Sequence, residues 1–265
     1  MRDDGFANLC ARIQQRMGVR MDESKRLFAQ TRLRKRLTAL QLPDIDAYSA
    51  YVLSNEAEFQ LCVECLVTHH TQFFREASHF PALTNVLDVA SNNAKIWCAA
   101  CSSGEEAYTL GIVLQEWAHA QPGRTFELHA SDVSERVLAA AQTGVYTLDK
   151  VDLPNKDLLA KYFQKGIGSQ TGKCRVKAHL RRTVSFYQHN LLDTPAAGLA
   201  QAAPFDVVFC RNVLIYFDTP TQRRVVDHLL GTLVPGGHLF VGHSEHVNSQ
   251  HHKVATLGGG VYKKQ

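Results

Sequence analysis

Hydrophobic side chains in the first 75 residues recur at helical spacing. Ala29, Leu33, Leu37 and Leu40 lie on one face of a helix, and Pro43 is expected to end it. A second helical stretch follows, with apolar positions at Tyr48, Val52, Phe59, Cys62, Val63 and Leu66. Strand-like alternation does not interrupt this pattern, so residues 1–75 are predicted to form a small all-α domain.

Short apolar runs alternate with helical segments in the rest of the chain. Strands are predicted over 95–100, 126–130, 184–188, 205–210, 238–242 and 260–263. Helices are predicted over 105–118, 134–142 and 219–233. Such alternation favours an open, mostly parallel α/β sheet over 95–265, preceded by a linker over 76–94. Glycines and alternating basic residues at about 163–183 predict a small antiparallel β insert within this domain.

Composition narrows the functional classes. Hydrophobic residues make up 45% of the chain and charged residues 20%, which is typical of a globular protein. The formal net charge of +4 is too small to demand a nucleic-acid partner. Seven scattered cysteines favour a reducing compartment over a disulfide framework. With an acidic start and no apolar run long enough to span a bilayer, we expect a cytoplasmic protein without membrane insertion.

Acidic residues follow the first two predicted strands of the α/β domain. Glu105 and Glu106 come directly after Gly104 at the start of a helix, where they would repel a pyrophosphate but attract a cation. Asp132 ends the second strand, where an acid can bind ribose hydroxyls. The structural alternatives are that Glu105 and Glu106 only complement the dipole of their helix, and that Asp132 only caps the helix that follows it. Together these acids favour S-adenosylmethionine as the ligand. Arg75 and Arg211 are candidates for binding its carboxylate, and the structural alternative is that they are surface residues.

Five segments then resemble one protein family. The segments are 68–76 (THHTQFFRE), 97–110 (WCAACSSGEEAYTL), 130–146 (ASDVSERVLAAAQTGVY), 205–218 (FDVVFCRNVLIYFD) and 233–245 (LVPGGHLFVGHSE). In this order they are similar to the CheR family of chemotaxis receptor methyltransferases, and the resemblance covers roughly residues 10–262. It implies an α-helical N-terminal domain, a Rossmann-like methyltransferase domain and an inserted β-subdomain. The implied activity is methyl transfer from S-adenosylmethionine to receptor glutamate carboxylates, with S-adenosylhomocysteine as product.

The resemblance also implies roles for individual residues. The implied cofactor contacts are His69, Thr71, Arg75, Glu105, Asp132, Asn190, Leu191, Arg211 and Asn212. Tyr216 would lie beside the transferred methyl group, and Tyr216 and Arg211 would position the acceptor carboxylate. The family often carries Asn where this sequence has His69, which is a departure from its pattern. A glutamate is already ionised at neutral pH, with a reference pKa of about 4.3, so we expect no general base.

The expected partners are the cytoplasmic helices of chemoreceptors. A basic stretch would dock to their acidic surface, although a solvated helix face is the simpler explanation. Its residues are Lys25, Arg26, Arg32, Arg34, Lys35 and Arg36. In this family the β-subdomain can bind a receptor's C-terminal peptide by strand addition. We expect a monomer.

Other functions are less consistent with the sequence. A methyltransferase for nucleic acid or small molecules is the nearest alternative, but amino-methylating enzymes carry Asn/Asp-Pro-Pro-Tyr/Phe where this chain has residues 211–214 (RNVL). A nicotinamide dehydrogenase would need a glycine fingerprint, which is missing. A non-catalytic module that only binds the cofactor is a third class. We expect no metal, because the Cys-x-x-Cys pairs are badly spaced and His243, His246, His251 and His252 have no acid or cysteine partner at metal-ligand spacing.

Overall fold

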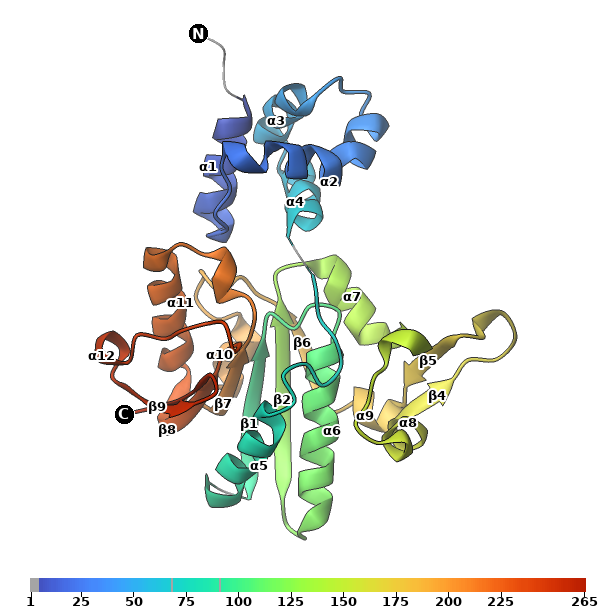
Figure 1. Cartoon of the computed structure of the whole chain (residues 1–265), viewed down its shortest axis with the longest axis vertical. Coiled ribbons are helices and arrows are strands. Elements are labelled where there is room, and N and C mark those ends of the chain that lie inside the picture. Colours follow the sequence, from blue (N-terminus) through green and yellow to red (C-terminus); the bar gives the residue numbers. More distant parts are fainter. Residues whose placement is uncertain (1–4, 68, 91) are drawn as a thin grey trace. The chain divides into compact units, whose positions relative to one another are not determined.

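The computed structural model describes residues 5–67, 69–90 and 92–265 (Figure 1). The chain divides into two compact units. One comprises residues 1–68 together with Tyr216–Gln222, and the other comprises His69–Ile215 together with Arg223–Gln265. The sequence pattern predicts a boundary near residue 75, whereas the units divide after residue 68. Nothing in the sequence indicates that Tyr216–Gln222 belongs with the N-terminal helices.

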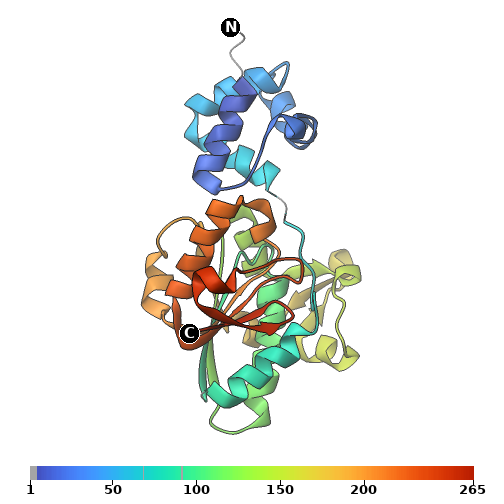
Figure 2. The same ribbon diagram turned by 60° about the vertical axis from the view of Figure 1, so that its left-hand side comes forward.

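The helical unit is built from four α-helices and a short 3-10 helix (Figures 1 and 2). These are α1 (Gly5–Met17), η1 (Glu23–Lys25), α2 (Arg26–Ala39), α3 (Ile45–Ser54) and α4 (Glu56–Leu66). The predicted second helical stretch is divided at Asn55, whose side chain accepts a hydrogen bond from the backbone N–H of Glu58 and begins α4. The segment Tyr216–Gln222 joins this unit through a backbone bridge between Val19 and Phe217.

A seven-stranded sheet forms the centre of the other unit. Its order is β6-β2-β1-β7-β8-β10-β9, and β10 is antiparallel to both of its neighbours. The strands are β1 (Asn93–Ala99), β2 (Thr125–Asp132), β6 (Val184–Gln188), β7 (Phe205–Cys210), β8 (Leu233–Phe240), β9 (Val254–Gly258) and β10 (Val261–Lys264). Strands β6, β2, β1, β7 and β8 are parallel. The chain order reverses on either side of β1, which is where open α/β sheets bind ligands.

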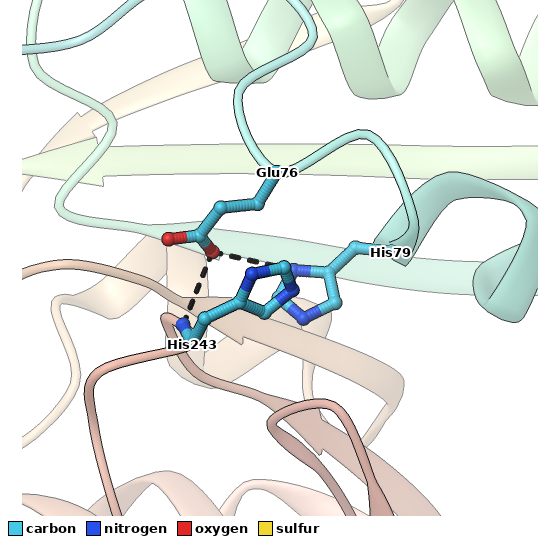
Figure 3. A group of neighbouring side chains, drawn as sticks. All are labelled: Glu76, His79 and His243. Atoms are coloured by element: carbon cyan, nitrogen blue, oxygen red, sulfur yellow. Dashed lines mark hydrogen bonds and ion pairs between the residues drawn. The ribbon is translucent and has the colours of Figure 1, made fainter.

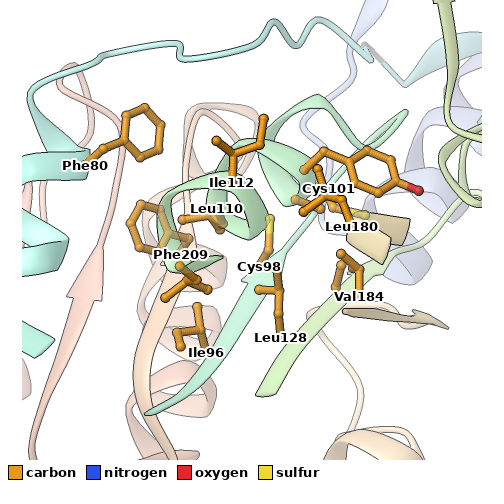
Figure 4. Packing of buried hydrophobic residues seen from close by; sticks show 14 of the residues in the cluster. Phe80, Ile96, Cys98, Cys101, Leu110, Ile112, Leu128, Leu180, Val184 and Phe209 are labelled. Atoms are coloured by element: carbon orange, nitrogen blue, oxygen red, sulfur yellow. The ribbon is translucent and has the colours of Figure 1, made fainter. Parts of the chain in front are cut away.

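Helices connect and cover these strands. They are α5 (His79–Ala90), α6 (Glu105–Ala120), α7 (Glu135–Thr143), α10 (Ala197–Ala202), α11 (Thr219–Gly231) and α12 (Ser249–His252). A hydrophobic core lies between α6 and the sheet, where Leu110, Ile96 and Phe209 are fully buried (Figure 4). The rings of Phe209 and Phe240 stack with centroids 4.4 Å apart. No helix among the described residues is both long and apolar enough to cross a membrane.

A small antiparallel sheet lies beside α6 and α9 (Ala178–Arg181), apart from the large sheet (Figure 1). Its order is β3-β5-β4, with β3 (Val145–Thr147), β4 (Phe163–Lys165) and β5 (Lys173–Val176). Between these strands lie η2 (Leu148–Lys150), α8 (Lys156–Tyr162) and η3 (Gly168–Gln170). The insert therefore begins earlier than the expected 163–183, because β3 is a strand of only three residues that its sequence pattern does not reveal.

The predicted fold class is confirmed: an all-α N-terminal domain precedes an open, mostly parallel α/β sheet with an antiparallel insert. Two details of the sheet differ from expectation. Strand β8 begins at Leu233, so Pro235 and the glycines after it lie within the strand rather than before it. Strand β9 was not predicted, because its burial is confined to Val254.

Candidate functional site

The carboxyl ends of β1, β2, β6 and β7 bring together most of the residues that the sequence singled out. These strands are neighbours in the sheet and run parallel, so the segments that follow them emerge at one edge. The backbone N–H of Cys101 after β1 donates to Ser131 in β2, and that of His189 after β6 donates to Asp132. These hydrogen bonds fix the loops against one another.

Glu105 is the first residue of α6 and is buried. It follows Gly104, which has a φ of 95° and caps the helix without a side chain. A Cβ on Gly104 would lie 2.8 Å from Cβ of Ala141 and 3.0 Å from Oη of Tyr146, so only glycine fits there. Burial raises the pKa of Glu105, while the hydroxyl of Ser103 donates to its carboxylate at 2.7 Å. A cationic ligand group would offset that burial.

Asp132, the last residue of β2, accepts backbone hydrogen bonds on both carboxylate oxygens. Oδ2 accepts from the N–H of Ser102 at 2.8 Å, and Oδ1 accepts from the N–H of Ser134 at 3.0 Å. Burial raises its pKa, and these N–H groups oppose the rise. The backbone N–H of Val133 contributes as well. A carboxylate has about four acceptor positions, so capacity remains for a ribose hydroxyl. The N-cap of α7 is Ser134, as the sequence allowed.

Four more predicted contact residues lie on segments at this edge. Asn190 and Leu191 come directly after His189, the first residue beyond β6; Leu191 is buried and Asn190 is partly buried. The carbonyl of His69 accepts a hydrogen bond from the hydroxyl of Ser102 at 3.3 Å, which places His69 beside the loop after β1. Thr71 is partly buried in the segment between His69 and α5.

Arg211, directly after β7, is the centre of a buried ionic cluster. Its Nη1 lies 2.8 Å from Oε2 of Glu106, and its Nη2 lies 2.9 Å from Oε2 of Glu76. Nη2 also donates to the carbonyl of Arg75 at 2.5 Å. The Nε of Arg211 is buried without a hydrogen-bond partner in the described part of the chain. The guanidinium is thus largely occupied by protein groups, which differs from the expected free carboxylate-binding arginine.

The two acids of this cluster have opposite pKa shifts. Burial alone would raise the pKa of Glu76, but hydrogen bonds from Asn212 and Arg211 outweigh it and lower the pKa to about 2. Burial raises the pKa of Glu106 despite its pairing with Arg211. Arg75, by contrast, is partly exposed and its side chain donates only to the carbonyl of His70 among the contacts described, at 3.1 Å. Its remaining N–H groups can serve a ligand.

Tyr216, the other expected catalytic residue, ends the 3-10 helix η4 (Leu214–Tyr216) and belongs to the helical unit. Its carbonyl accepts a hydrogen bond from the backbone N–H of Arg20 at 3.0 Å. The structure therefore brings Arg211 and Asn212 together with Glu105 and Asp132 in one unit, whereas Tyr216 is assigned to the other.

Sequence reasoning missed the residues that hold the site in shape. Glu76 and Glu245 appeared only within the segments that carry the resemblance. Glu106 was expected to attract a cationic ligand together with Glu105, whereas its carboxylate pairs with Arg211. A backbone signal also accompanies the site, because five residues other than glycine have a left-handed φ beside it. These are Phe74, Glu76, Ala100, Ser102 and Asn212. Such conformations are uncommon and cluster at functional sites.

The fold also brings histidines close to acids that are distant in sequence. Potential ligand atoms of Glu76, His79 and His243 lie within 4.8 Å of one another (Figure 3), and so do those of Asp227, His251 and His252. In the first group, however, Oε1 of Glu76 accepts from Asn212 and Oε2 accepts from Arg211 and the backbone of His243. These hydrogen bonds engage both carboxylate oxygens of Glu76 as acceptors.

The residues at the strand ends suit a cofactor that carries a cationic centre, an amino group and a ribose. The acids Glu105 and Asp132 are buried at the edge of the sheet, where two uncompensated carboxylates are costly unless a ligand pairs with them. The backbone at Gly104 leaves space that a side chain would fill. These residues therefore fit S-adenosylmethionine.

Comparison with known proteins agrees with this chemistry. Residues 69–262 match the model of the CheR methyltransferase SAM-binding domain, and residues 4–67 match that of the CheR methyltransferase all-alpha domain. The chain is 37% identical to a chemotaxis protein methyltransferase of Salmonella typhimurium, over 98% of this chain and 90% of the relative. It is 38% identical to chemotaxis protein methyltransferase 2 of Pseudomonas aeruginosa, over 98% and 92%. The chain therefore belongs to the CheR methyltransferase family.

Proposed function

We propose that this protein transfers a methyl group from S-adenosylmethionine to glutamate side chains of chemoreceptors, giving glutamate methyl esters. The observation that carries this proposal is the pair of buried acids, Glu105 and Asp132, at the edge of the sheet in a chain of the CheR family. When bound, S-adenosylmethionine supplies a methyl group made electrophilic by its sulfonium.

In this proposal each residue of the site has a separate task. Asp132 accepts hydrogen bonds from the ribose, and Glu105 accepts them from the amino group. Arg75 pairs with the methionine carboxylate, because its guanidinium has donors to spare. Asn190 and Leu191 border the adenine, while His69, Thr71 and Asn212 complete the cofactor contacts.

The acceptor needs alignment rather than activation. The bound cofactor would supply the methyl group and keep the electron pair of its carbon–sulfur bond, and an ionised glutamate oxygen would form the new bond. No proton moves in this step. Holding the reactants in line can contribute about 7–11 kcal/mol. Tyr216 and the Arg211 turn position the carboxylate, and exclusion of water leaves it reactive.

Two surfaces are candidates for receptor contact. The first is the exposed surface of η1 and α2, which carries Lys25, Arg32, Arg34 and Lys35. Arg26 and Arg36 do not belong to it, because they pair with Asp46 and Glu58 within the helical unit. The second surface is the small sheet, whose strands β3 and β4 pair only with β5 in the described part of the chain. A receptor's C-terminal peptide would add to one of these open edges. A cytoplasmic monomer suits both contacts.

Methyl transfer from S-[methyl-³H]adenosylmethionine to receptor-enriched membranes tests the proposal. We expect label that is released as methanol by base, which is characteristic of carboxyl methyl esters. Asp132→Asn should abolish most of the transfer, while the matched change at exposed Asp152 should not. Base-stable label, or label in RNA, would refute the proposal. So would cofactor binding without any transfer.

A further inference from the structure

Two acids that lie far apart in sequence hold the turn after β7 from opposite sides. The turn contains Arg211 and Asn212, and Asn212 has a left-handed φ of 58°. Glu76 precedes α5, while Glu245 follows β8. Each of them contacts both this turn and the segment Gly242–His243 after β8. We propose that Glu76 and Glu245 form a two-carboxylate clamp that positions Arg211 and Asn212 for methyl transfer.

Glu245 holds the backbone of the turn. Its Oε2 accepts from the N–H of Asn212 at 2.7 Å and from the N–H of Gly242 at 2.6 Å. Its Oε1 accepts from the N–H of Ile215 at 3.3 Å. Glu245 is only 6% exposed. A buried carboxylate that accepts several N–H groups fixes the course of a loop, because each N–H would otherwise be left unsatisfied.

Glu76 holds the side chains of the same turn. Its Oε2 lies 2.9 Å from Nη2 of Arg211, and its Oε1 accepts from Nδ2 of Asn212 at 3.1 Å. Its Oε2 also accepts from the N–H of His243 at 3.3 Å, and the ring of His79 lies on its other side (Figure 3). Nε2 of His79 bonds to the carbonyl of Gly259 at 2.5 Å, which fixes that ring. The carboxylate is thus held from several directions.

Gly242 shows how closely the parts of the clamp approach. A Cβ at Gly242 would lie 2.4 Å from Nδ2 of Asn212 and 2.9 Å from Oε2 of Glu245. Only a glycine allows the turn to rest against the segment after β8. Substitution of Gly242 would therefore displace Asn212 while leaving both acids present.

The clamp rests on the proposed function, because Arg211 and Asn212 are assigned to the site by that proposal. Glu76 and Glu245 act through the turn and are positioning residues. Misplacing a reacting group by about 1 Å can cost about 100-fold in rate. We therefore expect loss of kcat when either acid is removed, without loss of the fold.

The test compares Glu245→Ala, Glu245→Gln, Glu76→Gln and Gly242→Ala with the control Glu127→Ala, whose side chain is half exposed. We expect kcat to fall about 10- to 100-fold in Glu245→Ala and Gly242→Ala. Glu245→Gln should recover most of the rate, because its amide oxygen can still accept from Asn212 and Gly242. If Glu245 supplied only charge, Gln and Ala would be equally impaired. Glu76→Gln should lower kcat because an amide N–H₂ then faces Arg211 or Asn212.

Hydrogen exchange gives a second measurement that does not depend on activity. Amide exchange in 211–215 and at Gly242 should accelerate in Glu245→Ala relative to the control. Unchanged exchange would overturn the clamp, as would kcat values within threefold of the control in folded Glu245→Ala and Gly242→Ala. If Glu245→Ala fails to fold, Gly242→Ala and Glu76→Gln decide the question. Wild-type protein that transfers no methyl group would instead refute the proposed function, and the exchange measurement would still judge the clamp.

Discussion

Arg211 and Glu106 form an ion pair at the edge of the large sheet, with 2.8 Å between Nη1 and Oε2. The side chain of Arg211 is 1% exposed, and Glu76 binds the other end of its guanidinium. Because these groups engage most of the guanidinium, little of it is left for the methionine carboxylate. The partly exposed Arg75 is therefore the better candidate for the methionine carboxylate.

Arg75→Ala should weaken S-adenosylmethionine binding about 10- to 100-fold, since a hydrogen bond to a charged group contributes about 1.5–3 kcal/mol. The binding of 5′-methylthioadenosine, which lacks the carboxylate, should not change. Titration calorimetry with both ligands measures the two effects, with Arg182→Ala as an exposed control. Equal weakening of both ligands would argue against this role for Arg75.

Tyr216→Phe should lower kcat about tenfold or more, because a hydroxyl that orients an ionised acceptor is lost. The affinity for S-adenosylmethionine should change little. Initial rates of receptor methylation measure the effect, and Tyr51→Phe in the same helical unit is the control. Full activity of Tyr216→Phe would remove the polar role of this residue.

Charge reversal at exposed arginines of α2 should weaken receptor methylation. Arg32→Glu combined with Arg34→Glu is expected to lower kcat/KM for receptor about tenfold, mainly through slower association. Affinity for the cofactor, measured by calorimetry, should stay unchanged, and added salt should narrow the difference from wild type. Parallel losses of receptor methylation and cofactor binding would contradict docking through this face.

The thiols near the site should be unreactive in the folded protein. Cys98, Cys101 and Cys210 are buried, and burial raises the pKa of each thiol well above its usual range. Cys65 is the one partly exposed cysteine of the seven. At pH 8 a disulfide reagent should therefore titrate about one thiol rapidly, and all of them after denaturation. Rapid labelling of Cys210 would show that this edge of the sheet opens in solution.

The Glu58 carboxylate should make the helical unit less stable in acid. The hydrogen bond from Arg36 holds the pKa of Glu58 below 4.5, with a further contribution from the hydroxyl of Tyr48. A lowered folded-state pKa stabilises the fold above pH about 4.5, and this contribution is lost as the pH falls further. Glu58→Gln should cost about 1.5–3 kcal/mol at pH 7. Urea unfolding should show that the difference from wild type shrinks below pH 4.5; a constant difference would contradict the pairing.

Much of the candidate site could be predicted from the sequence, because its residues lie at the junctions between strands and helices. Gly104 and Glu105 lie where the connection from β1 enters α6, and Asp132 ends β2. A parallel sheet brings such positions to one edge whatever the details of packing. The buried runs of β1 and β7 were equally plain, since each strand contains four consecutive apolar residues, at 96–99 and 207–210.

The rest depended on contacts between distant segments. Glu76 and Arg211 are 135 residues apart, and an acid after a turn gives no local sign of the arginine that it will meet. The structural roles of Arg26 and Arg36 were hidden in the same way, because a basic run looks uniform until its partners Asp46 and Glu58 are placed. Short strands such as β3 are fixed by pairing with β5 rather than by their own composition.

The assignment of Tyr216–Gln222 to the helical unit has a consequence for dissection of the protein. The chain passes between the two units after residue 68, after residue 215 and again after residue 222. A fragment that began at His69 would leave Asp218 without its hydrogen bond from Gln14 and Tyr216 without that from Arg20. The N-terminal helices are therefore not a separable module. An exchange of these helices between relatives would have to include Tyr216–Gln222, which contains the end of η4 and the start of α11.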